Sequence, residues 1–276
     1  MDENIIKKAV RDGYARVARQ EGSCCSPKSS CCGGSETAAS ISKSIGYTDE
    51  EIGSLPEDAD LGLGCGNPLA FASIREGDVV LDLGSGAGID CFLAAKRVGP
   101  EGKVIGVDMT PEMVEKARIN ARRGGYGNVE FRLGEIESLP VADNSVNLII
   151  SNCVINLVPD KKRAFAEAFR VLGPGGRLMV SDIVLQKDLP EYIKNSVRAY
   201  VGCLSGASMK EQYIDAIRAA GFGDVKIVDE KSFPVDDMLN DPTAEVIIKS
   251  AQKPVEEIAR DMAGSILSIK VSAFKR

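Results

Sequence analysis

The stretch DVVLDLGSGAG, residues 78–88, carries the pattern on which the fold prediction depends. A continuous apolar run ends in three glycines spaced two residues apart, Gly84, Gly86 and Gly88. Such a run is typical of a buried strand, and glycine is needed where the backbone turns sharply and approaches a ligand closely. Residues 88–99 then show a helical pattern. We therefore predict a strand, a ligand-binding turn and a helix.

The glycine spacing disfavours two common nucleotide-binding loops. A dinucleotide-binding loop has the pattern G-x-G-x-x-G, but Ile89 stands where its third glycine would be. A phosphate-binding P-loop requires Gly-Lys-Ser or Gly-Lys-Thr, which this stretch lacks. The turn therefore points to a ligand of another class.

Strands and helices alternate on the carboxyl side of this turn. The apolar runs predict further buried strands at residues 103–109, 128–134, 145–152 and 177–185. Helical patterns lie between them, including one that Gly-Pro-Gly-Gly at residues 173–176 stops. Such alternation implies right-handed crossovers and a parallel sheet covered on both faces. The predicted fold class is α/β, a doubly wound and mostly parallel sheet of Rossmann-like type.

The two ends of the chain extend this core. A helical stripe at residues 5–18 precedes a cysteine-rich arm. Beyond residue 186 the sequence predicts two helices, a strand and a closing edge strand, at residues 190–200, 209–220, 224–230 and 265–276. We divide the chain into an N-terminal helix and arm, a ligand-binding core, and a smaller C-terminal elaboration with the final strands of the sheet: residues 1–60, 61–186 and 187–276.

Composition restricts the compartment and the partners. The chain of 276 residues has a formal net charge of −6, whereas a nucleic-acid-binding protein usually has a basic face. No apolar run approaches the roughly 18 residues of a membrane span, and the N-terminus mixes acids and bases, unlike a secretory signal. We therefore expect a cytoplasmic protein with no nucleic-acid or membrane partner. Nothing suggests an obligate assembly, so we expect a monomer.

Eight cysteines and no histidine restrict the chemistry. Four of the cysteines lie in SCCSPKSSCC, residues 23–32, and the others are Cys65, Cys91, Cys153 and Cys203. In a reducing cytoplasm, cysteines are more often ligands, nucleophiles or redox partners than a disulfide framework. Without histidine there is no imidazole for a nucleophile relay or a general base. Sulfur or oxygen must therefore hold any metal or metalloid.

The glycine turn resembles the loop of class I S-adenosylmethionine methyltransferases, in which an acid precedes alternating glycines. The resemblance implies a second acid for the ribose hydroxyls at the end of the next strand, where Asp108 stands. It also implies an acid that receives the adenine amine and a following residue that packs on the adenine, places that Glu135 and Ile136 occupy. S-adenosylmethionine is the implied cofactor, and we assign to its site Asp82, Gly84, Ser85, Gly86, Gly88, Asp108, Met109, Glu135, Ile136 and Asn152.

Three further phrases each surround a cysteine: LGLGCGNP at 61–68, NCVINL at 152–157 and GCLSGA at 202–207. Together with the cysteine-rich arm, they resemble the arsenite methyltransferases, and the similarity covers nearly the whole chain. The resemblance implies methyl transfer from S-adenosylmethionine to thiol-bound trivalent arsenic, as arsenic detoxification. Cys153 and Cys203 would hold the arsenic, with Cys65 as a further ligand.

The chemistry agrees with this resemblance. Trivalent arsenic is soft and prefers thiolates to oxygen or nitrogen donors. Thiolate ligation leaves a lone pair on arsenic that can attack the sulfonium methyl group, and the sulfonium is already a good leaving group. No general base is needed for the transfer, which suits a chain without histidine. The main contribution of the protein is therefore to hold the arsenic against the methyl group in a geometry suited to attack.

The cysteine-rich arm then has a role. A third thiolate, from the arm or from Cys65, could complete the coordination of arsenic. It could also form a disulfide when arsenic is oxidised, which a thiol or thioredoxin-like partner would reduce. The resemblance implies that one arm cysteine works with Cys65. The candidates are Cys24, Cys25, Cys31 and Cys32, of which we favour Cys32.

Other interpretations stay open. The arm could bind zinc, although adjacent cysteine pairs chelate less well than C-x-x-C. We interpret Cys91 as a small buried core residue and the acidic run at residues 50–60 as a solvated surface. The protein could instead methylate a small carbon or thiol acceptor. It could also bind soft metals through its thiolates without catalysis.

Overall fold

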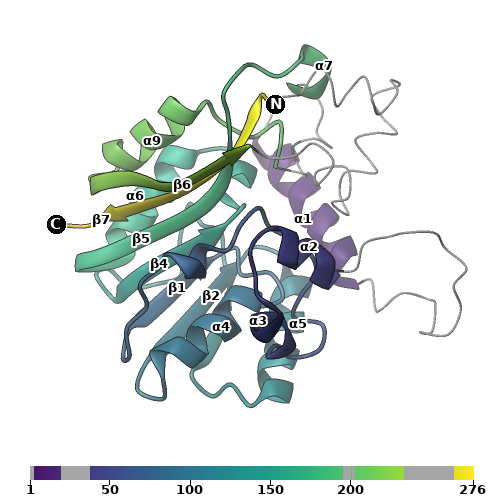
Figure 1. Ribbon diagram of the computed structural model, residues 1–276, viewed down its shortest axis with the longest axis vertical. Helices are drawn as coiled ribbons and strands as arrows, with labels where there is room; N and C mark the ends of the chain where they lie inside the picture. Colours follow the sequence, from purple (N-terminus) through teal and green to yellow (C-terminus); the bar gives the residue numbers. More distant parts are fainter. Residues whose placement is uncertain (1–2, 20–37, 195–199, 201–202, 233–263) are drawn as a thin grey trace, which may run out of the picture.

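A seven-stranded sheet forms the centre of the part of the chain that the structure describes (Figure 1). The structure is a computed structural model and describes residues 3–19, 38–194, 200, 203–232 and 264–276. The strand order is β3-β2-β1-β4-β5-β7-β6. The strands are β1 (Val79–Leu83), β2 (Lys103–Asp108), β3 (Val129–Leu133), β4 (Val146–Asn152), β5 (Leu172–Leu185), β6 (Gly223–Ser232) and β7 (Ile266–Phe274).

The pairing confirms the predicted fold class. Strands β1 to β5 are parallel to their neighbours among these five, and β7 is antiparallel to both β5 and β6. The order of the strands reverses between β1 and β4, because β2 lies on one side of β1 and β4 on the other. Parallel α/β sheets bind their ligands beyond the carboxyl ends of the strands at such a reversal. This topology therefore fixes where a ligand site is expected.

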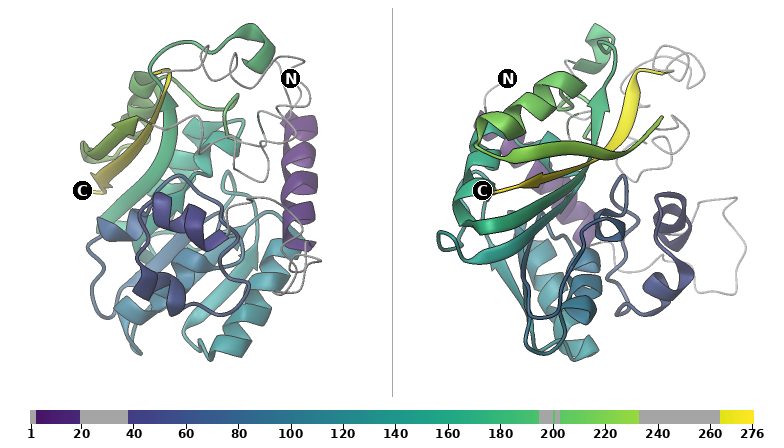
Figure 2. Two further views of the ribbon diagram at one scale, coloured as in Figure 1. Left: turned by 45° about the vertical axis from the view of Figure 1, so that its right-hand side comes forward. Right: turned by 60° about the vertical axis from the view of Figure 1, so that its left-hand side comes forward.

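Helices cover both faces of the sheet (Figures 1 and 2). Helices α4 and α5 contribute to the hydrophobic core on one face, and α6 and α9 contribute to the core on the other. The helices are α1 (Glu3–Arg19), α2 (Ala38–Ser44), α3 (Asp49–Gly53), α4 (Ile89–Val98), α5 (Pro111–Gly124), α6 (Lys161–Val171), α7 (Glu191–Lys194) and α9 (Lys210–Ala219), with short 3-10 helices η1 (Pro68–Ala70) and η2 (Ile155–Leu157).

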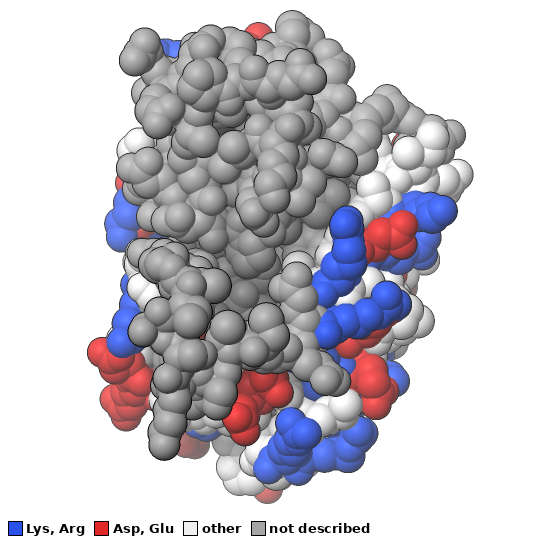
Figure 3. Space-filling view, turned by 90° about the vertical axis from the view of Figure 1, so that its right-hand side faces the viewer, with Lys and Arg blue, Asp and Glu red and all other residues white. Residues whose placement is uncertain are grey.

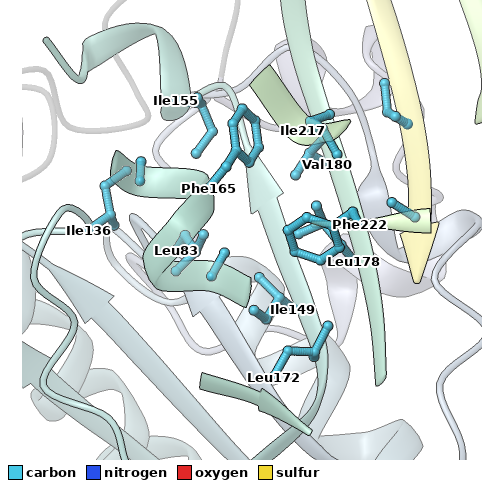
Figure 4. Close-up of a cluster of buried hydrophobic side chains, with 14 of the residues drawn as sticks. Leu83, Ile136, Ile149, Ile155, Phe165, Leu172, Leu178, Val180, Ile217 and Phe222 are labelled. Atoms are coloured by element: carbon cyan, nitrogen blue, oxygen red, sulfur yellow. The ribbon is translucent and has the colours of Figure 1, made fainter. Parts of the chain in front are cut away.

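Alternation along the strands divides the core between the two faces. Leu81 and Leu83 of β1 join the core beneath α6 and α9, whereas Val80 joins the core beneath α4 and α5. Figure 4 shows the first of these cores, where Phe165 of α6 and Ile217 of α9 lie over the strands. Both faces of the central strands are buried, and this explains the continuous apolar runs in the sequence.

Local sequence signals set the ends of two core helices. Helix α5 begins with Pro111 directly after Thr110, and Gly125 ends it in the left-handed conformation. Asp160 caps α6, because its carboxylate accepts a hydrogen bond from the backbone N–H of Arg163 at 3.0 Å. These helices return the chain so that successive strands run parallel.

The structure corrects two predictions about the sheet. The closing strand, β7, is not at the edge but lies between β5 and β6, and β6 forms the edge. The physical reason is burial: most of β7 is buried, whereas most residues of β6 are exposed or half-buried. Strand β5 also begins at Leu172 rather than at Arg177, since Leu172 already pairs with Val146 of β4.

Other predicted boundaries are tested only in part. In the predicted helix at residues 190–200, the structure describes α7 as Glu191–Lys194, and residues 195–199 lie outside the described residues. The cysteine-rich arm, with Cys24, Cys25, Cys31 and Cys32, also lies outside them. The division into segments 1–60, 61–186 and 187–276 stays a prediction.

The surface carries charges of both signs. On the face shown in Figure 3, the acidic and basic side chains of the described residues are interspersed rather than gathered in one patch of a single sign. No described helix has the length and apolar character required to span a bilayer.

Candidate active site

A cavity opens at the carboxyl ends of β1 and β4, where the order of the strands reverses. The glycine turn, Asp108 at the end of β2, and residues 134–137 after β3 form one part of its wall. Residues 152–154, at the end of β4 and directly after it, form another part with Cys203. The lining includes these predicted residues: Cys65, Asp82, Gly84, Ser85, Gly86, Asp108, Met109, Glu135, Ile136, Asn152, Cys153 and Cys203.

The three glycines of the turn have different neighbours. All three have positive φ, at 71°, 51° and 102° for Gly84, Gly86 and Gly88. A Cβ atom on Gly84 would lie 2.4 Å from the side chain of Val154, and one on Gly88 would lie 2.6 Å from Phe92. A Cβ atom on Gly86 would meet no atom within 4 Å. Gly86 therefore leaves open space at the cavity, whereas Gly88, which does not line it, permits close packing of α4.

Asp108 connects the glycine turn to β2. Its carboxylate accepts hydrogen bonds from the backbone N–H of Gly86 at 3.0 Å and of Thr110 at 2.8 Å. Burial raises the pKa of Asp108, although these backbone hydrogen bonds act in the opposite direction. The side chain is thus held in one orientation at the edge of the cavity.

Two buried carboxyl groups lie beneath the turn. The Cys91 thiol donates to Asp82 at 3.2 Å, and the Tyr47 hydroxyl donates to Asp90 at 2.7 Å. Burial, and then the charge of Asp90, raise the pKa of Asp82 well above its ordinary value. Burial also raises the pKa of Asp90 to about 6. Cys91 is buried, as predicted, but it also contacts the acid of the glycine motif.

Asn152 joins the end of β4 to the turn that contains Cys65. Its side-chain amide donates to the carbonyl of Gly66 at 2.7 Å and to the Tyr47 hydroxyl at 3.0 Å. Its oxygen accepts from the backbone N–H of Cys65 at 3.2 Å. Gly64 has φ of 122°, and a Cβ atom there would lie 2.9 Å from this amide. Asn152 therefore positions Cys65, in addition to lining the cavity.

The three predicted core cysteines meet at one end of the cavity. Cys65 and Cys203 are buried, and Cys153 is half-buried in the same hydrophobic cluster. The sulfur atoms of Cys65 and Cys153 and a carboxylate oxygen of Asp182 all lie within 4.8 Å of one another. The Cys203 thiol donates to the backbone carbonyl of Cys153 at 2.9 Å. Residues far apart in the sequence thus form one group of thiols.

Backbone conformation holds two of these cysteines. Cys153 and Cys203 have φ of 57° and 61°, in the left-handed region that side-chain-bearing residues rarely adopt. Each such residue costs about 1–2 kcal/mol. Strained backbone of this kind persists only where the surrounding structure determines it, and it is common at functional sites.

Cys65 and Cys153 are kept protonated near neutral pH. Burial raises the pKa of Cys65. A hydrogen bond with Cys203 lowers the pKa of Cys153, but the hydrogen bond with Cys65, burial and nearby charges outweigh it and leave this pKa well above its ordinary value. Cys65 and Cys153 are therefore neutral thiols until a soft ligand displaces their protons.

Asp182 lies behind the thiols and was missed by sequence reasoning. This buried residue of β5 accepts hydrogen bonds from the Tyr213 hydroxyl at 3.1 Å and from the side-chain amide of Asn156 at 2.7 Å. Burial raises its pKa to about 7. The available signal was an acid within the apolar run RLMVSDIVL, since a buried acid needs dedicated partners.

Two more cavity residues were missed in the sequence. Asp90 stands in the apolar helix pattern after the glycine turn, so it gave a similar signal. Asp60 belongs to the acidic run that we interpreted as solvated, but it lines the cavity, and one of its carboxylate oxygens is buried without a hydrogen-bond partner among the described residues. That interpretation is therefore wrong for Asp60, although Glu50, Glu57 and Asp58 are exposed.

The chain matches the family model of a methyltransferase domain over residues 74–221. With the doubly wound sheet and the glycine-turn cavity, this match defines an S-adenosylmethionine-dependent methyltransferase of Rossmann-like class I fold. The chain is 46% identical to an arsenite methyltransferase of Halobacterium salinarum over 269 residues, which cover 94% of this chain and 68% of that protein. The chain belongs to the arsenite methyltransferase family.

Two further comparisons agree. An arsenite methyltransferase of Aquipseudomonas alcaligenes is 35% identical, over 84% of this chain and 66% of that protein. The crystal structure of an arsenic(III) S-adenosylmethionine methyltransferase from Chlamydomonas reinhardtii superposes with a TM-score of 0.64 and 34% identity, over 85% of this chain and 73% of that chain. The chain thus spans about two thirds of the two microbial relatives, and it spans 46% of the human arsenite methyltransferase.

Proposed function

We propose that this protein transfers the methyl group of S-adenosylmethionine to trivalent arsenic held by Cys153, Cys203 and Cys65. The observation that carries the proposal is the meeting of these three cysteines at one end of the cavity that the glycine turn and Asp108 line. One cavity can therefore hold both the methyl donor and a thiol-bound acceptor.

The lining of the cavity suits a sulfonium cofactor. Its described residues include six carboxyl groups and no lysine or arginine: Asp60, Asp82, Asp90, Asp108, Glu135 and Glu137. Bound there, S-adenosylmethionine supplies a methyl group on a positively charged sulfur that leaves readily. Asp108 would hold the ribose hydroxyls, Glu135 would accept from the adenine amine, and Ile136 would pack on the adenine. Gly86 leaves the room for this approach.

The cysteines would place the acceptor. Three thiolates leave trivalent arsenic neutral, with its lone pair free to attack a methyl carbon. The left-handed backbone at Cys153 and Cys203 and the hydrogen bonds of Asn152 to the Cys65 turn hold the thiols in fixed positions. Pre-organisation of this kind is the main contribution needed from a protein when no proton has to be moved in the transfer.

The remaining steps involve partners outside the described residues. Methylation oxidises arsenic, so a reductant must act before the next transfer. We assign this step to the thiols of Cys65 and an arm cysteine, Cys32: they give two electrons to the oxidised arsenic and become a disulfide, which a thiol or thioredoxin-like reductant would then reduce. We further propose that the enzyme acts in the cytoplasm as a monomer.

Arsenic speciation tests the proposal. Protein, S-adenosylmethionine, arsenite and a thiol are mixed, and arsenic species are separated by chromatography with elemental detection. We expect methylated arsenic that disappears when the cofactor is omitted. Unchanged arsenite in the presence of folded, cofactor-bound protein would contradict the proposal, and it would favour a carbon or thiol acceptor or metal sequestration instead.

Replacement of one cysteine separates binding from transfer. Cys153→Ser removes an arsenic ligand but leaves the glycine turn and Asp108 intact. We expect a loss of arsenic methylation of at least about 100-fold, since misplaced reacting atoms cost rates of this order. Binding of S-adenosylmethionine, measured by calorimetry, should change by less than about twofold. Retained methylation would exclude Cys153 as an arsenic ligand.

A further inference from the structure

Helix α1 forms one wall of the cofactor cavity although it lies far from the glycine turn in the sequence. Val10 and Tyr14, one helical turn apart, line the cavity. Ile6, one turn earlier, is buried with Val10 in the cluster that also contains Cys65 and Cys203. Figures 1 and 2 show α1 at one side of the core that the sheet and its helices form. The same face of α1 therefore contacts the cavity and the thiol group.

Lys7 of this helix forms ion pairs with two glutamates that line the cavity. The Lys7 ammonium lies 2.7 Å from a carboxylate oxygen of Glu135 and 2.9 Å from one of Glu137. The side chains of Lys7 and Glu137 are only 17% and 7% exposed, so this pair is shielded from water. Burial lowers the pKa of Lys7, but the hydrogen bonds and charges of the two glutamates outweigh it and leave the pKa raised. Lys7 therefore stays charged at neutral pH.

Two further polar contacts of α1 with the core, at Ala18 and Arg19, are at its far end. Lys116 donates to the backbone carbonyl of Ala18 at 3.3 Å, and Arg19 pairs with Glu112 in an ion pair whose arginine is mostly exposed. Exposed ion pairs contribute little to stability, whereas breaking a buried pair leaves an uncompensated charge. Lys7 thus attaches α1 beside the cavity through an ion pair that is shielded from water.

We propose that Lys7 is a positioning residue for the cofactor: by joining Glu135 and Glu137, it holds α1 closed as a wall of the cavity and so retains S-adenosylmethionine. Lys7 donates to one oxygen of Glu135, and Glu135 itself lines the cavity, so this carboxylate connects α1 to the ligand site. This inference rests on the proposed function only in taking S-adenosylmethionine as the ligand of the cavity. It requires neither arsenic nor methyl transfer.

Paired lysine variants test the inference. Lys7→Met keeps the length and apolar stem of the side chain but removes the charge. Lys8→Met removes an exposed charge from the next position of the same helix and is the matched control. We expect Lys7→Met to raise the Kd of S-adenosylmethionine about tenfold, mostly through faster dissociation measured by stopped flow. Lys8→Met should bind as the unmodified protein does, and Lys7→Arg should restore most of the affinity.

Hydrogen exchange supplies a readout without ligand. In Lys7→Met, the amides of α1 should exchange faster than in Lys8→Met, while those of β1 and β4 stay protected. Glu137→Gln breaks the same ion pair by removing the charge of its partner in the core, and it should also raise the Kd of S-adenosylmethionine. This second variant tests the inference if Lys7→Met folds poorly.

Two results would overturn the inference. One is a cofactor dissociation rate in Lys7→Met equal to that in Lys8→Met. The other is equal exchange of the α1 amides in the two variants. Both are distinct from a failure of the proposed function: cofactor retention that depends on Lys7 could be observed even if arsenite were never methylated, and the exchange measurement stands even if the cavity holds another ligand.

Discussion

At the scale of single residues, the space around each glycine of the turn decides its role. Gly84 and Gly86 both have positive φ, so a side chain at either position costs about 1–2 kcal/mol. Of these two positions, only at Gly84 would the new Cβ atom also overlap a neighbour, Val154. The same substitution should therefore have different consequences two residues apart.

We predict that Gly84→Ala lowers the free energy of unfolding by more than about 2 kcal/mol, because overlap adds to the backbone strain. Gly86→Ala should cost only the backbone strain of about 1–2 kcal/mol but should weaken S-adenosylmethionine binding, since the methyl group enters the space left for the ligand. Denaturant unfolding and calorimetry measure the two effects. Equal destabilisation by both variants would contradict this distinction.

Asp182 raises the pKa of the thiols beside it. Its own pKa is about 7, so its carboxylate is charged mainly above pH 7. We predict that Asp182→Asn lowers the pKa of Cys65 and Cys153, because an anion that opposes thiolate formation is removed. Titration by ultraviolet thiolate absorbance should show more thiolate in the variant between about pH 8 and 10.

The control for Asp182 uses the thiols themselves. In a protein that carries Cys65→Ser and Cys153→Ser, adding Asp182→Asn should leave most of the remaining thiolate titration unchanged. The arm cysteines contribute equally to the titration with and without Asp182→Asn, both in the unmodified background and in the double cysteine variant. A variant whose thiolates form at higher pH than those of the unmodified protein would contradict the assigned direction.

At the scale of elements, Asn152 connects strand β4 to the segment of residues 61–66. It accepts from the Cys65 N–H and donates to the Gly66 carbonyl, while the cysteine itself belongs to a loop before the sheet. Cys153 follows directly on the strand. One residue thus sets the relative position of two of the predicted arsenic ligands.

We predict that Asn152→Ala weakens arsenite binding several-fold, because each lost hydrogen bond contributes about 1 kcal/mol to the position of the turn. The Cys65 amide should also exchange faster. Asn147→Ala is the matched control: Asn147 is on the same strand at its amino end, where its side chain accepts from the Val79 N–H at 2.8 Å. Similar effects of both variants on arsenite binding would show that Asn152 has no special role.

At the scale of the whole molecule, the buried acids couple the stability of the fold to pH. The pKa of Asp90 is raised from 3.8 to about 6, mainly by burial. Between these values the folded state holds a proton that the unfolded state has released. The contribution of Asp90 to stability is therefore present below about pH 4 and is lost as the pH rises to about 6.

We predict that Asp90→Asn, which cannot ionise, gains stability relative to the unmodified protein as the pH rises through this window. The relative gain should be of the order of 1–3 kcal/mol and should level off above about pH 6. Denaturant unfolding at several pH values measures it. A relative gain that decreases between pH 4 and pH 6 would contradict the sign.

Local patterns along the chain were sufficient to predict the class of fold and the type of chemistry. Continuous apolar runs that end in glycine or acid and alternate with helical patterns are typical of strands buried on both faces, so the parallel sheet and the positions of Asp82 and Asp108 followed from local pattern. The absence of histidine and the three cysteine phrases likewise restricted the chemistry to thiol and carboxyl groups. These predictions use residues that are close together in the sequence, so they do not require knowledge of which distant segments pack together.

Which residues meet could be seen only once the chain was folded. It placed Asp182 beside Cys65 and Cys153, Tyr47 on Asp90, and Lys7 between Glu135 and Glu137. It also placed β7 inside the sheet, although the alternation of its residues is equally compatible with an edge. The physical reason is that contacts between distant segments depend on how the layers pack and on which polar groups are buried together. Periodicity along one segment carries no information about its partner.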